Sequence, residues 1–310
     1  MGPSVLAPPV PCLRMRTAIG ALGRVLITVG LLILLFVAYQ LWGTGIYAAR
    51  AQNELESDFE AQLEEASTTT TSPLEAPPPP PEGEAVARIK IPDIGVDWIV
   101  VNGVQTSDLK KGPGHYPETP MPGQVGNAAI AGHRTTYGAP FHRLDELAAG
   151  DEILVTTLAG TYTYTLQENP FVVEPTEVEV LLPEPEVGPD GAPSGTFKAQ
   201  ITLTTCNPKY SAAQRLIVKA VLDTGASPEP KPATTTPTDE LSLDAGLSGD
   251  DASLRPAVLW GGIVILVGGL WWFLFHRYPR WTTWLVGVLP FLVVLFFFYT
   301  YLERLLPANY

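Results

Sequence analysis

Charge and cysteine are both scarce in this chain of 310 residues. Only 16% of the residues are charged, whereas about 25% is usual for a soluble protein. The formal net charge of −13 argues against nucleic acid as a partner. No acidic cluster has the spacing of a calcium loop, so we predict neither a metal site nor a cofactor.

Long uncharged apolar runs take the place of the missing charge. They cover residues 25–42, 257–275 and 281–302, and each is long enough to cross a bilayer. A cleaved signal peptide is the alternative for the first run, and a buried soluble helical hairpin is the alternative for the other two. We predict three transmembrane helices in a multi-pass protein of the cell membrane.

Arginines flank these runs unevenly. Arg14, Arg16 and Arg24 precede the first run, and Arg277 and Arg280 lie in the short turn between the other two. Because positive residues favour the cytoplasmic side, we expect a cytoplasmic N-terminus and an extracytoplasmic region between the first and second runs. The two cysteines, Cys12 and Cys206, then lie on opposite sides of the membrane and cannot pair.

Composition divides the extracytoplasmic region into a folded part between two spacers. Pro- and Thr-rich stretches are typical of extended or disordered chain. The predicted order is a cytoplasmic N-terminus (1–24), a transmembrane helix (25–42), a stalk and Pro/Thr-rich spacer (43–84), a folded domain (85–225), a disordered linker (226–255) and two transmembrane helices (257–275 and 281–302). The acidic start of the first spacer is expected to extend the first helix as a short stalk.

Short alternating apolar runs separated by turn residues dominate the folded part. Such a pattern predicts a mainly β domain, either a closed barrel or a sandwich. The runs cover residues 87–91, 96–101, 127–131, 153–157, 161–166, 171–173, 197–205 and 215–222. A hairpin is expected at Leu158-Ala159-Gly160, and one short helix is expected around residues 140–147.

Cys206 ends one of these runs, and Asn207-Pro208 follows it. A turn directly after the strand places the thiol at a rim of the domain. A buried structural cysteine is the alternative. A nucleophilic cysteine needs a proton-transfer partner, usually histidine, and a donor for the developing oxyanion.

Three histidines of the extracytoplasmic region could serve as that partner. His133 follows an apolar strand and comes directly after Gly132, His115 lies in a loop rich in glycine and proline, and His142 lies on the expected short helix. By placement His133 is the best candidate, although a histidine in any of these three places is more often structural than catalytic.

Arg215 begins the strand that follows the Cys206 loop. An antiparallel hairpin of the two strands would bring the guanidinium close to the thiol. Arginine suits this place because it remains charged and donates through a planar fork. A solvated surface arginine is the alternative.

The segments that hold these three residues resemble the sortase family of cysteine transpeptidases. Thr202-Leu203-Thr204-Thr205-Cys206 matches the T-L-x-T-C signature, Gly132-His133-Arg134 matches the histidine segment, and Arg215 matches the arginine at the start of the next strand. The order and spacing match over about residues 86–221. The details at His133 to Gly138 and at Cys206 to Pro208 are most similar to the class E sortases of actinobacteria.

The resemblance implies a sortase-type eight-stranded β-barrel with one or more short helices. It also implies that Cys206 attacks the Thr–Gly bond of a C-terminal sorting signal, L-A-x-T-G-like or L-P-x-T-G, in proteins of a Gram-positive cell surface. His133 would be the general acid and base, and Arg215 would hold the substrate carbonyl. Substrate binding is assigned to the neighbouring residues Thr204, Thr205, Asn207 and Tyr137.

The partners implied are sorting-signal proteins, an amine acceptor of a peptidoglycan precursor or a pilin, and the lipid bilayer. Two other functions stay open. One is a hydrolytic cysteine protease that uses the same three residues and releases surface proteins. The other is a membrane-tethered β-domain without catalysis, in which Cys206 is buried and inert.

Overall fold

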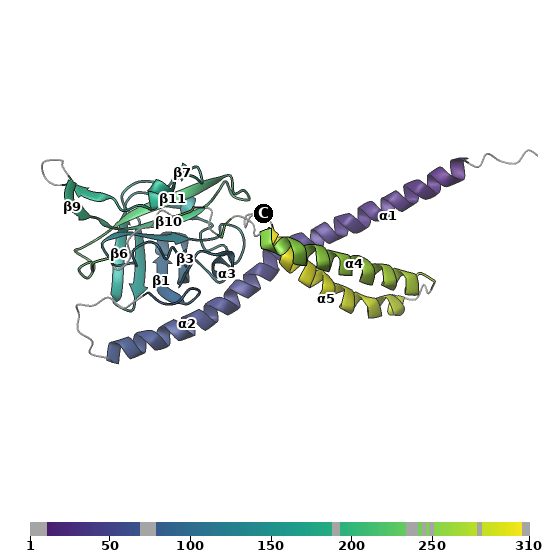
Figure 1. Cartoon of the computed structure of the whole chain (residues 1–310), viewed down its shortest axis with the longest axis horizontal. Coiled ribbons are helices and arrows are strands. Elements are labelled where there is room, and N and C mark those ends of the chain that lie inside the picture. The colour runs from purple at the N-terminus through teal and green to yellow at the C-terminus, as the bar shows by residue number, and fades with distance from the viewer. Residues whose placement is uncertain are drawn as a thin grey trace, which may run out of the picture. The chain divides into compact units, whose positions relative to one another are not determined.

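The computed structural model describes residues 11–68, 79–187, 193–233, 241–243, 246–247, 251–277 and 281–305. The remaining parts of the predicted spacers and termini lie outside these residues. The chain divides into two compact units, Met1–Gly43 and Thr44–Tyr310. The first contains helix α1 (Pro11–Ala38) and a π-helical turn (Tyr39–Gly43). The second contains the β-domain and, among the described residues, the four α-helices α2 to α5 (Figure 1).

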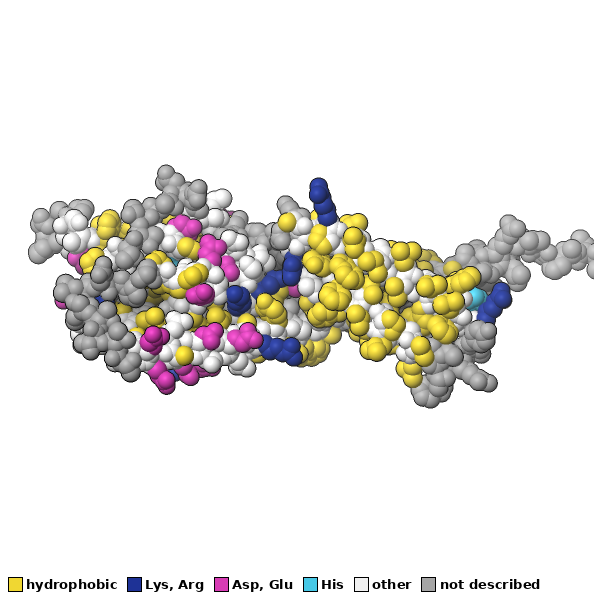
Figure 2. Space-filling model, turned by 60° about the horizontal axis from the view of Figure 1, so that its bottom comes forward, with side chains coloured by type: hydrophobic (Ala, Val, Ile, Leu, Met, Phe, Trp, Pro, Cys, Tyr) yellow, Lys and Arg dark blue, Asp and Glu magenta, His cyan; other side chains and the backbone are white. Residues whose placement is uncertain are grey.

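Three helices among the described residues are long and apolar enough to cross a membrane, as the sequence predicts. The qualifying segments are Ile19–Ala38 of α1, Leu254–Phe275, which is α4, and Leu285–Leu305 of α5 (Trp281–Leu305). Figure 2 shows mostly apolar side chains on the helices of membrane-spanning length, whereas acidic side chains lie on the β-domain and on the polar helix α2 (Thr44–Thr68). A 3-10 turn, Asp251–Ser253, precedes α4. The orientation of these helices in the membrane stays a prediction.

Eight strands form a closed ring, which confirms the predicted eight-stranded barrel. Each neighbour in the order β10-β4-β3-β2-β1-β5-β6-β11 is hydrogen-bonded to the next, and β11 pairs with β10 to close the ring. The strands are β1 (Ala85–Ile91), β2 (Val96–Asn102), β3 (Gly114–His115), β4 (Gly126–Ala131), β5 (Glu152–Thr157), β6 (Gly160–Leu166), β10 (Ala199–Asn207) and β11 (Gln214–Leu222). A ninth strand, β7 (Phe171–Val173), pairs with β11 beside β6.

The two faces of the barrel wall carry two separate apolar clusters. Successive side chains of a strand point to opposite faces. In β10, Ile201 and Leu203 join the main core cluster, whereas Cys206 belongs to the second one. In β11, Leu216 belongs to the main core and Ile217 to the second cluster. The alternation therefore fills the barrel and at the same time builds an apolar layer around the thiol.

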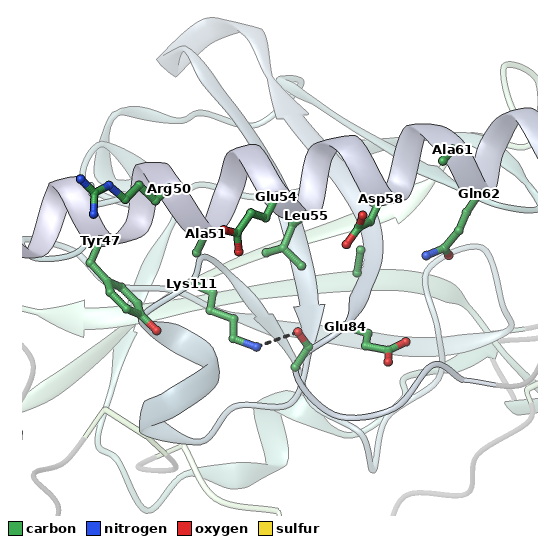
Figure 3. Close-up of a pocket in the computed structure, with 12 residues that line it drawn as sticks. Tyr47, Arg50, Ala51, Glu54, Leu55, Asp58, Ala61, Gln62, Glu84 and Lys111 are labelled. Carbon is green, nitrogen blue, oxygen red and sulfur yellow. Dashed lines mark hydrogen bonds between the residues drawn. The ribbon is translucent and has the colours of Figure 1, made fainter.

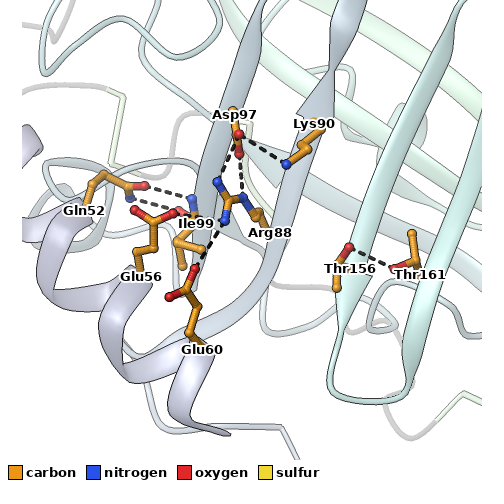
Figure 4. Close-up of polar contacts among 9 residues, drawn as sticks. All are labelled: Gln52, Glu56, Glu60, Arg88, Lys90, Asp97, Ile99, Thr156 and Thr161. Atoms are coloured by element: carbon orange, nitrogen blue, oxygen red, sulfur yellow. Dashed lines mark hydrogen bonds and ion pairs between the residues drawn. The ribbon is translucent and has the colours of Figure 1, made fainter. Parts of the chain in front are cut away.

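Helix α2 (Thr44–Thr68) packs against the barrel (Figure 4). Its Phe59 is buried in a cluster with Ile99 of β2. The Gln52 side chain accepts from the Ile99 amide at 2.8 Å and donates to the Ile99 carbonyl at 3.0 Å. Arg88 of β1 forms an ion pair with Glu56 at 2.9 Å. The expected helical extension is present, but it is a docked element of the domain rather than a separate stalk.

Of the other connections predicted from the sequence, one is confirmed and one is wrong. The hairpin between β5 and β6 is confirmed. The helix expected around residues 140–147 is wrong, because only the 3-10 turn Leu144–Glu146 forms there. The backbone before that turn is engaged elsewhere, since the Phe141 amide donates to the His133 carbonyl at 3.1 Å. The remaining short elements are the turns Pro92–Ile94 and Val178–Leu181, helix α3 (Thr106–Leu109), and a hairpin of β8 (Pro185–Val187) and β9 (Pro193–Phe197).

Candidate active site

Cys206 and Arg215 lie directly opposite each other in the antiparallel pair of β10 and β11. Directly opposite residues of such a pair have Cβ atoms about 4.5–5.5 Å apart and point to the same face. The hairpin predicted from the sequence is therefore confirmed, and it places a guanidinium side chain beside the thiol.

His133 comes to the same place through the parallel pairing of β4 with β10. Thr204 is opposite Ala131, and the Gly132 amide donates to the Thr204 carbonyl at 3.0 Å. Thr205 Oγ1 donates to the Gly132 carbonyl at 2.7 Å. Continuing this register by two residues sets His133 beside Cys206.

The other two histidine candidates have local partners instead. His115 Nε2 lies 2.9 Å from the Pro120 carbonyl oxygen, inside the loop that follows β3. His142 Nδ1 lies 2.8 Å from the Arg134 carbonyl oxygen. Both contacts are typical of histidines that order a loop, which favours His133 among the three, and the catalytic role of His133 stays a prediction.

The three side chains are completely buried. Cys206, His133 and Arg215 each have 0% of their surface exposed. Neither ring nitrogen of His133 has a hydrogen-bond partner among the described residues. Burial, together with the positive charge of Lys110, lowers the pKa of His133 to about 3. The imidazole is therefore neutral at physiological pH in this closed arrangement of the site.

Arg215 is held in place by backbone carbonyl groups. Its Nη1 donates to Ala212 at 2.8 Å and to Gln214 at 2.9 Å. Its Nε donates to the carbonyl of Leu243, a residue beyond the barrel, at 3.0 Å. The planar fork is thus fixed by its own loop, and one donor is directed at a carbonyl group that comes from a distant part of the chain.

The four residues assigned to substrate binding lie around the three. The Tyr137 ring is 5.1 Å from the His133 ring, and Asn207 Oδ1 accepts from Arg134 at 2.7 Å. The Thr205 hydroxyl is engaged with Gly132, which favours a structural role for it. The buried Thr204 hydroxyl has no hydrogen-bond partner among the described residues.

Two cations at the site were not predicted from the sequence. Arg134 Nη1 donates to the Cys206 carbonyl at 3.1 Å, and Arg134 Nη2 pairs with Asp145 at 3.1 Å. Lys110 Nζ lies 5.3 Å from the centre of the Tyr137 ring and pairs with Glu303 of α5 at 3.5 Å. The position of Arg134 directly after His133 is a signal that could have been used, whereas nothing in the sequence pattern distinguishes Lys110.

A pocket of about 760 Å³ lies elsewhere, between α2 and the loops that lead into β1 and follow α3 (Figure 3). Glu54 and Asp58 of α2 face it, and Lys111 donates to the Gly83 carbonyl at 3.0 Å on its far wall. None of the residues predicted to be catalytic lines this pocket.

The buried histidines predict an acid-sensitive fold. Burial lowers the pKa of His115 to about 4, and that of His133 is about 3, whereas unfolded histidine titrates near ~6.5. Between about pH 6 and pH 4.5 the unfolded chain therefore binds more protons, and unfolding free energy falls by about 1.4 kcal/mol per pH unit for each histidine as pH decreases. We expect the thermal midpoint to fall less steeply in a chain with His115→Gln and His133→Gln. Parallel pH profiles would contradict this.

Comparison with known proteins agrees with this geometry. A family model described as the sortase domain matches residues 89–223. Sortase SrtE1 of Streptomyces coelicolor is 34% identical over 64% of this chain and 55% of its own length. Sortase SrtE2 of the same organism is 32% identical over 65% of this chain and 80% of its own length. A structure of sortase E from Streptomyces avermitilis is 36% identical, covers 49% of this chain and 99% of that chain, and has a TM-score of 0.40.

The chain spans only about half of SrtE1, at 55%, but four-fifths of SrtE2. The sortase model, which matches residues 89–223, falls on the barrel that carries Cys206, His133 and Arg215. The chain therefore belongs to the sortase family of cysteine transpeptidases, with class E sortases of Streptomyces among its relatives.

Proposed function

We propose that this protein is a membrane-anchored sortase that cuts the Thr–Gly bond of a C-terminal sorting signal and transfers the threonine carbonyl to an amine. The signal is L-A-x-T-G-like or L-P-x-T-G, and the acceptor amine belongs to a peptidoglycan precursor or a pilin. The observation that carries the proposal is the register that sets Cys206 opposite Arg215 in a member of this family.

The first half of the reaction uses all three residues. His133, neutral at rest, takes the Cys206 proton, and the thiolate attacks the threonine carbonyl carbon. Arg215 donates to the carbonyl oxygen as it becomes an oxyanion. The carbon–nitrogen bond then breaks, and the imidazolium gives its proton to the leaving glycine amine. The product of this half is a thioacyl enzyme with a neutral His133.

The second half reverses these roles. The acceptor amine attacks the thioacyl carbon, His133 removes the extra proton from the nitrogen, and the Cys206 thiolate leaves and is protonated again. Arg134, which donates to the Cys206 carbonyl, would keep the end of β10 in place throughout. Water in place of the amine would give the hydrolytic alternative with the same residues.

The proposed topology has the barrel outside the membrane and both ends of the C-terminal hairpin on the barrel side. Lys110 beside the site pairs with Glu303 near the end of α5. This ion pair supports a topology in which the C-terminal end of α5 lies on the same side of the membrane as the barrel. The Arg277-containing turn would then face the cytoplasm, in agreement with the positive-inside rule.

The test uses the full chain in detergent with a quenched L-A-x-T-G or L-P-x-T-G peptide and triglycine as the amine. We expect a product in which the threonine is joined to triglycine, identified by mass spectrometry. Cys206→Ala should form none, whereas the matched variant Cys12→Ala should form as much as the unmodified chain. Threonine acid without ligated product would favour the protease, and no product from either peptide would contradict the proposal.

A further inference from the structure

Helix α5 carries a buried carboxylate near its C-terminal end. Glu303 lies within the segment Leu285–Leu305, which is long and apolar enough to span a membrane, and only 8% of its surface is exposed. An ionised group in a membrane helix is costly, and such groups are usually paired and serve a function. The C-terminal hairpin therefore contains a group that anchoring alone does not require.

Two side chains of the β-domain contact this carboxylate. Lys110, which directly follows α3, places its Nζ 3.5 Å from Glu303 Oε1. The Tyr137 hydroxyl donates a hydrogen bond to the same oxygen. Only 10% of the Lys110 side chain and 7% of the Glu303 side chain are exposed, so salt screens this ion pair little. These contacts join the end of α5 to the loop that follows β4.

Tyr137 in turn packs against the active-site histidine. Its ring centre lies 5.1 Å from that of His133, with 30° between the two ring planes. The Tyr47 ring of α2 meets the Tyr137 ring edge-on, with 6.3 Å between the centres, and Lys110 Nζ lies 5.3 Å from the Tyr137 ring centre. The Tyr137 ring therefore lines one side of the His133 imidazole, and its hydroxyl ends on Glu303.

The loop that carries Tyr137 depends on contacts from outside it. Tyr137 and Ala139 have positive φ values of +52° and +50°, which side chains other than glycine rarely adopt and keep only where the surroundings hold them. The Tyr137 amide donates to Thr44 Oγ1 of α2 at 3.3 Å, and its hydroxyl donates to Glu303. Tyr137 is thus held at its backbone by α2 and at the end of its side chain by α5.

We propose that Glu303 is a positioning residue of the active site, which holds the Tyr137 ring against His133 and so keeps the imidazole directed at the Cys206 thiol. This role rests on the proposed function only in taking His133 as the proton-transfer group. The C-terminal hairpin is then part of the catalytic unit as well as an anchor, because the end of α5 supplies the contact.

The first test observes the histidines without any reaction. The full chain is labelled with ¹³C at its four histidines and studied in detergent by NMR, and His133→Gln identifies the His133 ring signal. Glu303→Leu should shift this signal, because the Tyr137 ring beside it moves, and should leave the other three in place. The matched control is Arg304→Gln on the same helix, whose guanidinium lies 5.2 Å from the Tyr301 ring, and it should shift none. An unchanged His133 signal in Glu303→Leu, or shifts of all four signals, would overturn the proposal.

The second test uses ligation of a quenched sorting-signal peptide to triglycine. Glu303→Leu should lower kcat about tenfold, because the imidazole is misplaced, and should leave KM for the peptide within about twofold. Tyr137→Phe removes the other half of the same hydrogen bond, so the double variant should be at most about twofold slower than Glu303→Leu alone. Losses that multiply in the double variant would contradict the coupling. If no variant and no unmodified chain ligates the peptide, the proposed function fails, and the histidine signals still decide the role of Glu303.

Discussion

Replacing Arg215 with lysine is expected to lower kcat/KM for peptide ligation by about 10²- to 10³-fold, the loss typical when one oxyanion donor is removed. Lysine keeps the charge but lacks the planar fork of donors. Arg215 Nη1 donates to the Ala212 and Gln214 carbonyl groups, and Nε donates to the Leu243 carbonyl group. A single ammonium group cannot donate to the loop carbonyl groups and to a carbonyl group in the site at the same time. The measurement is steady-state ligation followed by mass spectrometry.

The control for this substitution is Arg143→Lys. Arg143 is exposed and pairs with Glu146 at 2.6 Å on the surface, where lysine can replace it at little cost. We expect ligation by this variant to remain within about twofold of the unmodified chain. If Arg215→Lys retained more than a third of the activity, the guanidinium would not be the donor to the reacting carbonyl.

The second large effect separates two histidines with nearly the same burial. His133 has 0% and His115 1% of its surface exposed, yet only His133 lies beside Cys206. His133→Gln should lower kcat/KM by about 10²- to 10⁴-fold because it removes the proton-transfer group. His115→Gln should leave the ligation rate of the folded protein unchanged, since His115 contacts Pro120 and Thr119 away from the thiol.

The same pair of variants can also be compared without measuring activity. If His133 exchanges a proton with the Cys206 thiol, the rate at which a thiol reagent labels Cys206 depends on the ionisation of His133. His133→Gln should remove this contribution to the pH profile of the labelling rate, whereas His115→Gln should keep it. Equal loss of activity in both variants would assign the effect to folding rather than to proton transfer, and would contradict the role given to His133.

Local patterns were sufficient to predict the strands and the central hairpin. The run Ile201 to Cys206 ends at Asn207-Pro208, and the next apolar run starts at Arg215, so two antiparallel strands and their facing ends follow from the chain itself. The structure confirms this pair, with Cys206 opposite Arg215. The position of His133 is less local, because it depends on a parallel pairing of β4 with β10 that no periodicity reveals.

What the sequence did not predict arises from contacts between distant segments. The linker around Leu243 has the Pro, Thr, Asp and Ser content of disordered chain, yet Leu243 and Leu247 are buried in the apolar cluster that contains Cys206. Composition describes the average character of a segment. Whether the segment packs against the barrel depends on single side chains and on the close approach of Gly246 to the backbone of Val104 and Gln105. The same holds for α2, because nothing in the sequence around Gln52 indicates that its side chain accepts a hydrogen bond from the Ile99 backbone amide.

The closed ring of strands also determines which changes of sequence the enzyme can accept. Every strand of the ring has a neighbour on both sides, and a slip of one residue would turn Arg215 from its face of the wall to the opposite one. The loops outside the ring carry no such constraint of register: the part of the β10–β11 loop before Ala212, whose carbonyl group accepts from Arg215, can change length while the strand ends stay paired. Peptide selectivity can therefore diverge through loop insertions and deletions, while the thiol and the guanidinium remain in one register.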